Sequence, residues 1–135
     1  LRLTDPHRAR LLATMRGPEG LVIILVLSPD GRHMAVASHD RTVRLFDLAT
    51  REQTGQLGPL RRPAAALCFL ADGSYLATVC QENAVQLWDL ATHTPGATLW
   101  GPADESFVGL ALFGESNHLA VALGDGRIRI WGPAA

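Results

Sequence analysis

The chain has 135 residues, of which 47% are hydrophobic and 19% charged, and this balance excludes an intrinsically disordered protein. Its length is sufficient for one ordinary domain with a buried core. The formal net charge of −1 is unlike that of proteins that bind nucleic acid or an anionic membrane surface, so we expect no nucleic-acid partner and no membrane association.

Residues 1–16 are expected to be the end of one repeating unit. The segment LRLTD matches the end of a third strand, and about residues 9–15 offer a fourth strand. Residues 17–57 then form a first whole unit, residues 58–100 a second, and residues 101–135 a last unit that lacks its outer strand.

Each whole unit is predicted to contain four short strands of falling hydrophobicity. An almost continuous apolar run, at 21–27, 64–70 and 107–113, indicates a first strand that is buried on both faces. A tight turn and a second apolar run follow, and then a segment of period two, as in TVRLFD and AVQLWD. Because helical periodicity is not sustained for three turns in any segment, we expect an all-β, antiparallel fold.

The unit repeats with a nearly constant period. Phe46, Trp88 and Trp131 are 42 and 43 residues apart, and each ends a segment of period two. A period in the low forties with four strands per repeat is typical of a β-propeller blade. Such sheets stack radially because a single four-stranded sheet cannot bury both of its faces.

In these motifs the chain resembles the WD-repeat β-propeller family over nearly its whole length. The resemblance rests on an Asp-Gly turn after the first strand, an acidic residue before the third strand, and an aromatic residue at the end of that strand, followed in two units by aspartate. These signature positions are Asp30, Gly31, Asp40, Phe46, Asp47, Asp72, Gly73, Trp88, Asp89 and Trp131. The resemblance implies that residues 1–135 form a partial propeller, an incomplete ring of about three four-stranded blades.

The chain departs from the family pattern at a buried hydrogen-bonding set. The family has a Gly-His pair before the innermost strand, whereas Gly-Pro stands here at 17–18, 58–59 and 101–102, and proline cannot replace histidine in such a set. The Ser/Thr position is occupied by Val36, Thr78 and Val121, and the acidic position by Asp40, Glu82 and Asp125. Without a histidine partner, these acids are expected at the solvated edge of the blades, capping turns through backbone N–H groups.

The number of blades leaves two arrangements open. Propellers close with about four to eight blades, so about three blades leave apolar sheet faces uncovered. The chain is either the C-terminal part of a longer propeller, or a second copy completes the ring head to tail. Its start at leucine rather than methionine favours the longer protein.

Catalytic and metal-binding patterns are missing, and we expect that the chain is not an enzyme and has no cofactor or metal. GESNH at 114–118 lacks the final glycine of a nucleophile elbow and fits a β-turn, and GDGR at 124–127 fits a two-residue hairpin turn. The histidines lack metal-ligand spacing. Counting residues across the hairpin places Cys68 opposite about Ala77 and Cys80 opposite about Ala65, so the two cysteines are expected about 10 Å apart, too far for a disulfide. A reducing, cytoplasmic location is therefore expected.

The family resemblance implies a non-catalytic scaffold for protein–protein interaction. One face of the ring collects the connections between blades and the turns between second and third strands, and loops on a rigid scaffold commonly carry binding residues. The candidate partner-binding residues on this face are His39, Arg41, Arg61, Arg62, Asn83, Asp104, Glu105 and Asp125. This mixed-charge rim suits a protein or peptide partner that carries both signs. The alternative is a ligand-sensing propeller that regulates an enzymatic or nucleotide-switch domain in the same longer chain.

Overall fold

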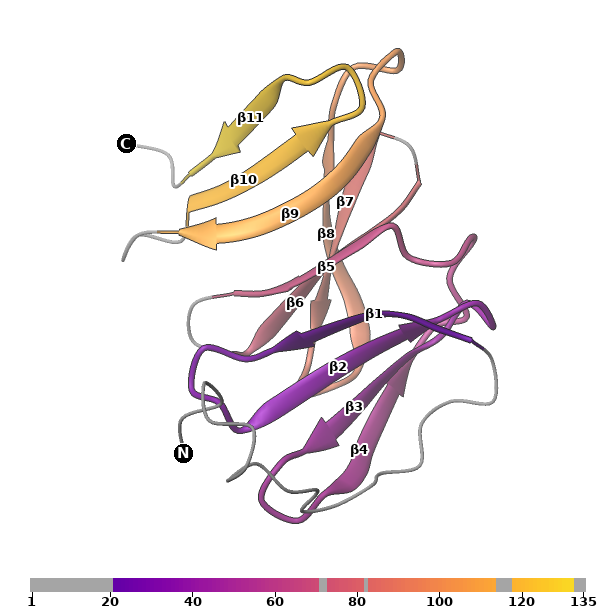
Figure 1. The fold of residues 1–135 in the computed structure, drawn as a ribbon, viewed down its shortest axis with the longest axis vertical. Coiled ribbons are helices and arrows are strands. Elements are labelled where there is room, and N and C mark those ends of the chain that lie inside the picture. Colours follow the sequence, from indigo (N-terminus) through magenta and orange to yellow (C-terminus); the bar gives the residue numbers. More distant parts are fainter. Residues whose placement is uncertain (1–20, 71–72, 82, 114–117, 133–135) are drawn as a thin grey trace, which may run out of the picture.

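The structure is a computed structural model that describes residues 21–70, 73–81, 83–113 and 118–132. These residues form three antiparallel sheets that follow one another along the long axis of the molecule (Figure 1). The first sheet contains β1 (Val22–Leu27), β2 (His33–Ser38), β3 (Val43–Asp47) and β4 (Glu52–Leu57). The second contains β5 (Ala66–Phe69), β6 (Tyr75–Gln81), β7 (Ala84–Asp89) and β8 (Thr94–Trp100). The third contains β9 (Phe107–Phe113), β10 (His118–Leu123) and β11 (Ile128–Trp131).

The predicted all-β, antiparallel fold class is confirmed. Within each sheet, strands that follow one another in the sequence pair with one another, as expected for strands joined by tight turns. The described part of the chain contains no helix that is long and apolar enough to cross a membrane.

Apolar side chains fill the spaces between successive sheets, because each sheet must bury its hydrophobic faces against another element. The cluster between the first and second sheets includes Leu45, Leu57, Leu67, Phe69 and Leu76. The cluster between the second and third sheets includes Val79, Val85, Phe107, Leu119 and Val121. Full burial of one such side chain contributes about 1.5–3 kcal/mol, so these two interfaces hold the arc of sheets together.

The first strands of the three sheets lie side by side, and β5 contacts both β1 and β9 (Figure 1). The prediction that these strands are buried on both faces is wrong for β1 and β9. Leu25 and Leu27 of β1 are 55% and 56% exposed, and Val108 of β9 is 51% exposed. The reason is that, within the described residues, the first and the third sheet each meet another sheet on one side only.

Glycines stand in the turns where the sequence predicts turns, but one turn is longer than predicted. Gly31 and Gly73, after β1 and β5, have φ angles of 71° and 75°, which suit glycine. The turn between β10 and β11 is longer by one residue than the predicted two-residue hairpin, because the N–H of Leu123 donates to the carbonyl of Arg127. Gly126 has a φ of 95° and forms the bulge that closes this three-residue loop.

The signature aspartates close turns at the ends of the strands. Asp47 accepts hydrogen bonds from the N–H groups of Ala49 and Thr50 at 2.8 and 3.1 Å, and these bonds, the one from Thr50 most, lower the pKa of Asp47. Asp89 makes the corresponding two bonds in the second sheet. Asp30 accepts from the N–H of the second residue after it. Asp47 and Asp89 thus stabilise the same turn, after the third strand, in the first and second sheets, and Asp30 stabilises the turn after β1.

The aromatic ends of the third strands differ in their hydrogen bonds. Trp88 Nε1 donates to Thr78 Oγ1 at 3.0 Å in a buried position. Val121 stands in the place of Thr78 in the third sheet, and Trp131 Nε1 is buried without an acceptor in the part of the chain that the structure describes. The side chain of Phe46, at this place in the first sheet, has no N–H group that needs an acceptor. The third sheet therefore carries a buried donor without a partner, which generally costs about 1–3 kcal/mol.

Some of the expected features lie outside the described residues. They are the strands predicted in residues 1–16, the β-turn at 114–117, and the signature or acidic positions Asp72 and Glu82.

Candidate functional site

The candidate site is the end of the blades where the connections between sheets lie. We call it the loop face and define it by residues 39–41, 58–63, 83, 101–106 and 124–126. It contains all eight residues that the sequence singled out for partner binding. Their side chains have different surroundings, so they do not contribute equally to a binding surface.

Arg41 and the 58–63 connection are joined by backbone contacts. The N–H of Leu60 donates to the carbonyl of Arg41 at 2.7 Å. A Cβ atom added at Gly58 would lie 2.9 Å from the same carbonyl oxygen, so the close approach of the two segments requires glycine there. Arg61 and Arg62 follow in the connection, and both residues are exposed, as is Arg41. These contacts hold the turn that carries Arg41 against the connection that carries Arg61 and Arg62.

Arg41 occupies an unfavourable backbone conformation. Its φ is 69°, in the left-handed region that non-glycine residues rarely adopt. Its turn has the same hydrogen bonds as the turn before β11, from Ser38 N–H to Thr42 and from Arg41 N–H to Ser38. Gly126 holds the corresponding position there. The turn therefore accepts glycine, and arginine at this position has a conformational cost.

Asp40 and His39 flank this position with different roles. Asp40 Oδ1 accepts from the N–H and the hydroxyl of Thr42 at 2.9 and 2.6 Å, and Oδ2 lies 3.7 Å from the Arg44 guanidinium. The Thr42 hydroxyl in particular holds the pKa of Asp40 below its usual range. The expected capping role is confirmed for Asp40. His39 is exposed, and its N–H donates to the carbonyl of Leu21 at 3.0 Å.

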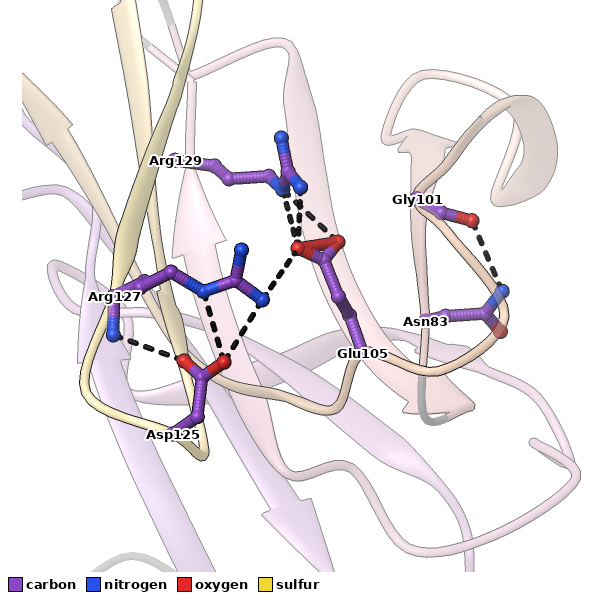
Figure 2. Close-up of polar contacts among 6 residues, drawn as sticks. All are labelled: Asn83, Gly101, Glu105, Asp125, Arg127 and Arg129. Atoms are coloured by element: carbon purple, nitrogen blue, oxygen red, sulfur yellow. Dashed lines mark hydrogen bonds and ion pairs between the residues drawn. The ribbon is translucent and has the colours of Figure 1, made fainter.

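Glu105 was expected on an accessible rim, and this expectation is wrong. Its side chain is 2% exposed, because Arg129 and Arg127 cover it (Figure 2). Arg129 Nε donates to both carboxylate oxygens at 2.8 and 2.9 Å, and the terminal nitrogen of Arg129 also contacts Glu105 Oε1. Arg127 lies 3.3 Å from the same oxygen. Glu105 therefore fixes the 101–106 connection to β11 and is not available to a partner.

Asp125 caps the turn before β11, as expected. Its carboxylate accepts from the Arg127 N–H at 3.0 Å and from Arg127 Nε at 2.8 Å (Figure 2). The Arg127 side chain is the main cause of the lowered pKa of Asp125. Both side chains are more than half exposed, so water screens this ion pair. Asp125 remains accessible, although Arg127 neutralises much of its charge.

Asn83 and Gly101 form a second clamp between segments. Gly101 N–H donates to the Asn83 carbonyl at 2.8 Å, and Asn83 Nδ2 donates to the Gly101 carbonyl at 3.1 Å (Figure 2). A Cβ atom at Gly101 would lie 2.5 Å from the buried ring of Phe107. Asn83 thus serves mainly to position the connection. Asp104, by contrast, is exposed, and its negative charge acts on Arg127.

A hollow of about 150 Å³ opens between the second and third sheets beside the 58–63 connection. Its walls are largely apolar and include Val79, Phe107 and Val108, with Arg62 and Ser106 as polar members. The sequence did not predict this hollow, because its walls come from three separate segments of the chain, at 62–65, 79–80 and 106–108.

The part of the chain that the structure describes contains no group of three or more histidine, cysteine, aspartate or glutamate residues placed to hold a metal ion. Cys68 pairs with Ala77, as predicted from the hairpin register, and Cys68 and Cys80 are half-buried and form no disulfide. The loop face therefore offers exposed arginines, two accessible acids, Asp104 and Asp125, and an apolar hollow. Groups of these kinds can contact a binding partner.

Stacked antiparallel sheets, two of four strands and one of three, with connections gathered at one end define a β-propeller arc. The family model described as "WD domain, G-beta repeat" matches residues 9–47 and 61–89, which is half of the chain. The chain therefore belongs to the WD40 repeat family. Proteins of this family are generally non-catalytic scaffolds for protein interaction.

Solved propeller structures share this fold. The chain is similar to U3-55K, with a TM-score of 0.74 and 18% identity over 87% of this chain and 38% of that one. It is similar to the RRP9 WD40 repeats, with a TM-score of 0.73 and 18% identity over 87% of this chain and 37% of that one. It is also similar to the β-propeller domain of Cps50 (Swd1) from Myceliophteria thermophila, with a TM-score of 0.71 and 23% identity over 89% of this chain and 37% of that one.

At these identities the likeness shows the fold alone. The chain spans less than two fifths of the length of these three structures. A comparison with curated protein sequences finds no match.

Proposed function

We propose that this chain is a non-catalytic protein-interaction scaffold whose binding surface is the loop face. The observation that carries the proposal is that Arg41 and Arg61 are both exposed on two segments, the turn between β2 and β3 and the 58–63 connection, which the hydrogen bond from Leu60 N–H to the Arg41 carbonyl joins. Charged side chains on loops that a rigid sheet scaffold positions are a common form of protein-binding surface.

Site-specific photo-crosslinking tests this function. A photoreactive residue is placed at position 61 or 104 on the loop face, and as matched controls at Arg51 or Thr92, which are exposed in turns at the opposite end of the blades. Protein partners are expected to crosslink at the loop-face positions only. Equal crosslinking from both ends, or from the control positions alone, would contradict the proposal.

We also propose that further blades complete the ring, supplied by a longer chain or by a second copy. Leu25 and Leu27 on the first sheet, and Ile128 and Ile130 on the third, are each more than half exposed. Apolar faces of this kind favour a covering sheet. Light scattering of the purified 135-residue chain tests the second copy, because a discrete dimer supports it and a stable monomer contradicts it.

We further propose a cytoplasmic, reducing location, which two cysteines that form no disulfide support. Imaging of the tagged protein in cells tests this proposal, and secretion would contradict it.

A further inference from the structure

Arg41 and Arg61 form a positive patch on the loop face that the described residues do not neutralise. Neither guanidinium makes an ion pair within the described ranges, and both residues are exposed. The neighbouring acid, Asp40, already accepts two bonds from Thr42 and faces Arg44. Arg62 has an interaction of its own, so the patch rests on Arg41 and Arg61. Guanidinium groups of this kind bind carboxylates and phosphates through two parallel hydrogen bonds.

The apolar hollow lies beside this patch. Arg62 and Pro63 line the hollow together with Cys80, and Arg61 directly precedes them in the same connection. Burial raises the pKa of the Cys80 thiol, and the backbone and the charge of Arg61 oppose that shift. Val108 is 51% exposed at the same place. A volume of about 150 Å³ is large enough for a ring the size of benzene in other proteins. The hollow can therefore accept one aromatic or leucine side chain.

The backbone of Arg41 supplies a variant for testing the patch. Gly126 shows that this three-residue turn forms with glycine, yet Arg41 occupies the position at a φ of 69°. Arg51 has a similar φ of 62° in the exposed turn before β4, at the opposite end of the first sheet. It therefore provides a matched control for Arg41.

We propose that Arg41, Arg61 and the hollow together bind a short anionic peptide segment of the protein partner. The carboxylates or phosphates of the segment pair with the two guanidinium groups, and one apolar side chain enters the hollow between β5 and β9. This inference rests on the proposed function, because it specifies what the loop face recognises.

Fluorescence polarisation with defined peptides tests the inference on the 135-residue chain. The first probe is a fluorescein-labelled peptide in which aspartates flank a single phenylalanine, and the second replaces the aspartates with phosphoserine. A third replaces the phenylalanine with serine, and a fourth replaces the acids with lysine. We expect the first or second probe to bind, the third to bind about 5-fold more weakly and the fourth not to bind. Which of the first two binds more tightly identifies carboxylate or phosphate as the natural anion.

Variants then locate the binding. R61E is expected to weaken binding of the better probe about 10-fold, and R41G about 5-fold. R51G is expected to leave binding unchanged. Because both glycine variants remove an arginine from a left-handed position, both should also raise the thermal midpoint, which shows that R41G is folded. V108D, at the mouth of the hollow, should abolish the preference for phenylalanine over serine.

Three results would overturn this inference. They are an absence of binding by both anionic probes, equal loss in R41G and R51G, and equal binding of the phenylalanine and serine peptides. Binding of a polyuridine oligonucleotide that R41G and R61E weaken to the same extent would also overturn it in favour of a nucleic-acid site. If protein partners crosslink at position 61 while R41G and R61E leave their capture unchanged, the proposed function stands and the anionic-peptide site does not.

Discussion

Replacement of Val121 by threonine is expected to stabilise the protein. Trp131 Nε1 is buried without an acceptor among the described residues, and Val121, which is fully buried, occupies the place where Thr78 accepts a bond from Trp88 in the second sheet. Valine and threonine have nearly the same shape, so the new hydroxyl replaces a methyl group. It accepts from Trp131 Nε1 and donates to the carbonyl of Arg129, as Thr78 donates to the carbonyl opposite it at 3.4 Å.

The size of the effect follows from the two groups involved. A buried donor without a partner costs about 1–3 kcal/mol, and a satisfied buried hydrogen bond contributes about 0.5–1.5 kcal/mol. The hydroxyl of V121T must itself be removed from water, which offsets part of this gain. We therefore expect V121T to raise the free energy of unfolding by about 1 kcal/mol, equivalent to about 3–5 °C in the thermal midpoint of a chain of this length.

Urea unfolding and a thermal scan measure this change, and the indole N–H resonance of Trp131 in the NMR spectrum reports the bond directly. The matched control is T78V, which should create an unpaired donor at Trp88 and lower stability by about 1–3 kcal/mol. Adding W88F to T78V should recover part of that loss, because it removes the donor. The reasoning is refuted if V121T lowers stability while the Trp131 resonance does not move.

Three further predictions concern the connections and the turns. E105Q should lower the free energy of unfolding by about 1–3 kcal/mol in urea titrations, because it weakens the charged hydrogen bonds from Arg129, and an unchanged midpoint would contradict a structural role for this buried acid. G101A should lower stability by about 1–3 kcal/mol, because its Cβ would lie 2.5 Å from the Phe107 ring, whereas G96A, with its nearest atom at 3.5 Å, should change stability by less than about 0.5 kcal/mol. The turn aspartates have lowered pKa values in the folded state, so their stabilisation is present above about pH 4 and is lost as the pH falls through the folded pKa values. Thermal midpoints should therefore decline from pH 5 to pH 2, and a flat profile would show that these bonds do not contribute to stability.

The pattern of strands could be predicted from the sequence because its signals are local. Period-two segments ending at Phe46, Trp88 and Trp131 mark the third strands, and Asp-Gly pairs mark the turns. The register of Cys68 opposite Ala77 followed from counting residues across one hairpin. The length of the turn at Gly126 did not follow, because two- and three-residue hairpins use the same residue types.

The burial of the first strands was misjudged for a different reason. An apolar run indicates that a strand is suited to burial on both faces, but the exposure of Leu25, Leu27 and Val108 depends on whether another sheet is present. Whether a neighbouring sheet covers a strand depends on how the sheets are arranged in the folded protein. The apolar sequence of the strand does not determine it.

For the candidate site, the position of each residue could be predicted from the sequence, but its contacts could not. The residues of the loop face could be predicted from the sequence, because strand order and turn positions assign each loop to one end of a blade. The burial of Glu105 by Arg129 and the hydrogen bond from Leu60 N–H to the Arg41 carbonyl could not be predicted. These contacts join segments that are about twenty residues apart in the chain, and side chains at that separation meet only when packing brings their strands together. The accessible charge of the loop face is therefore set by contacts between segments, whereas its residue content is set by the repeat.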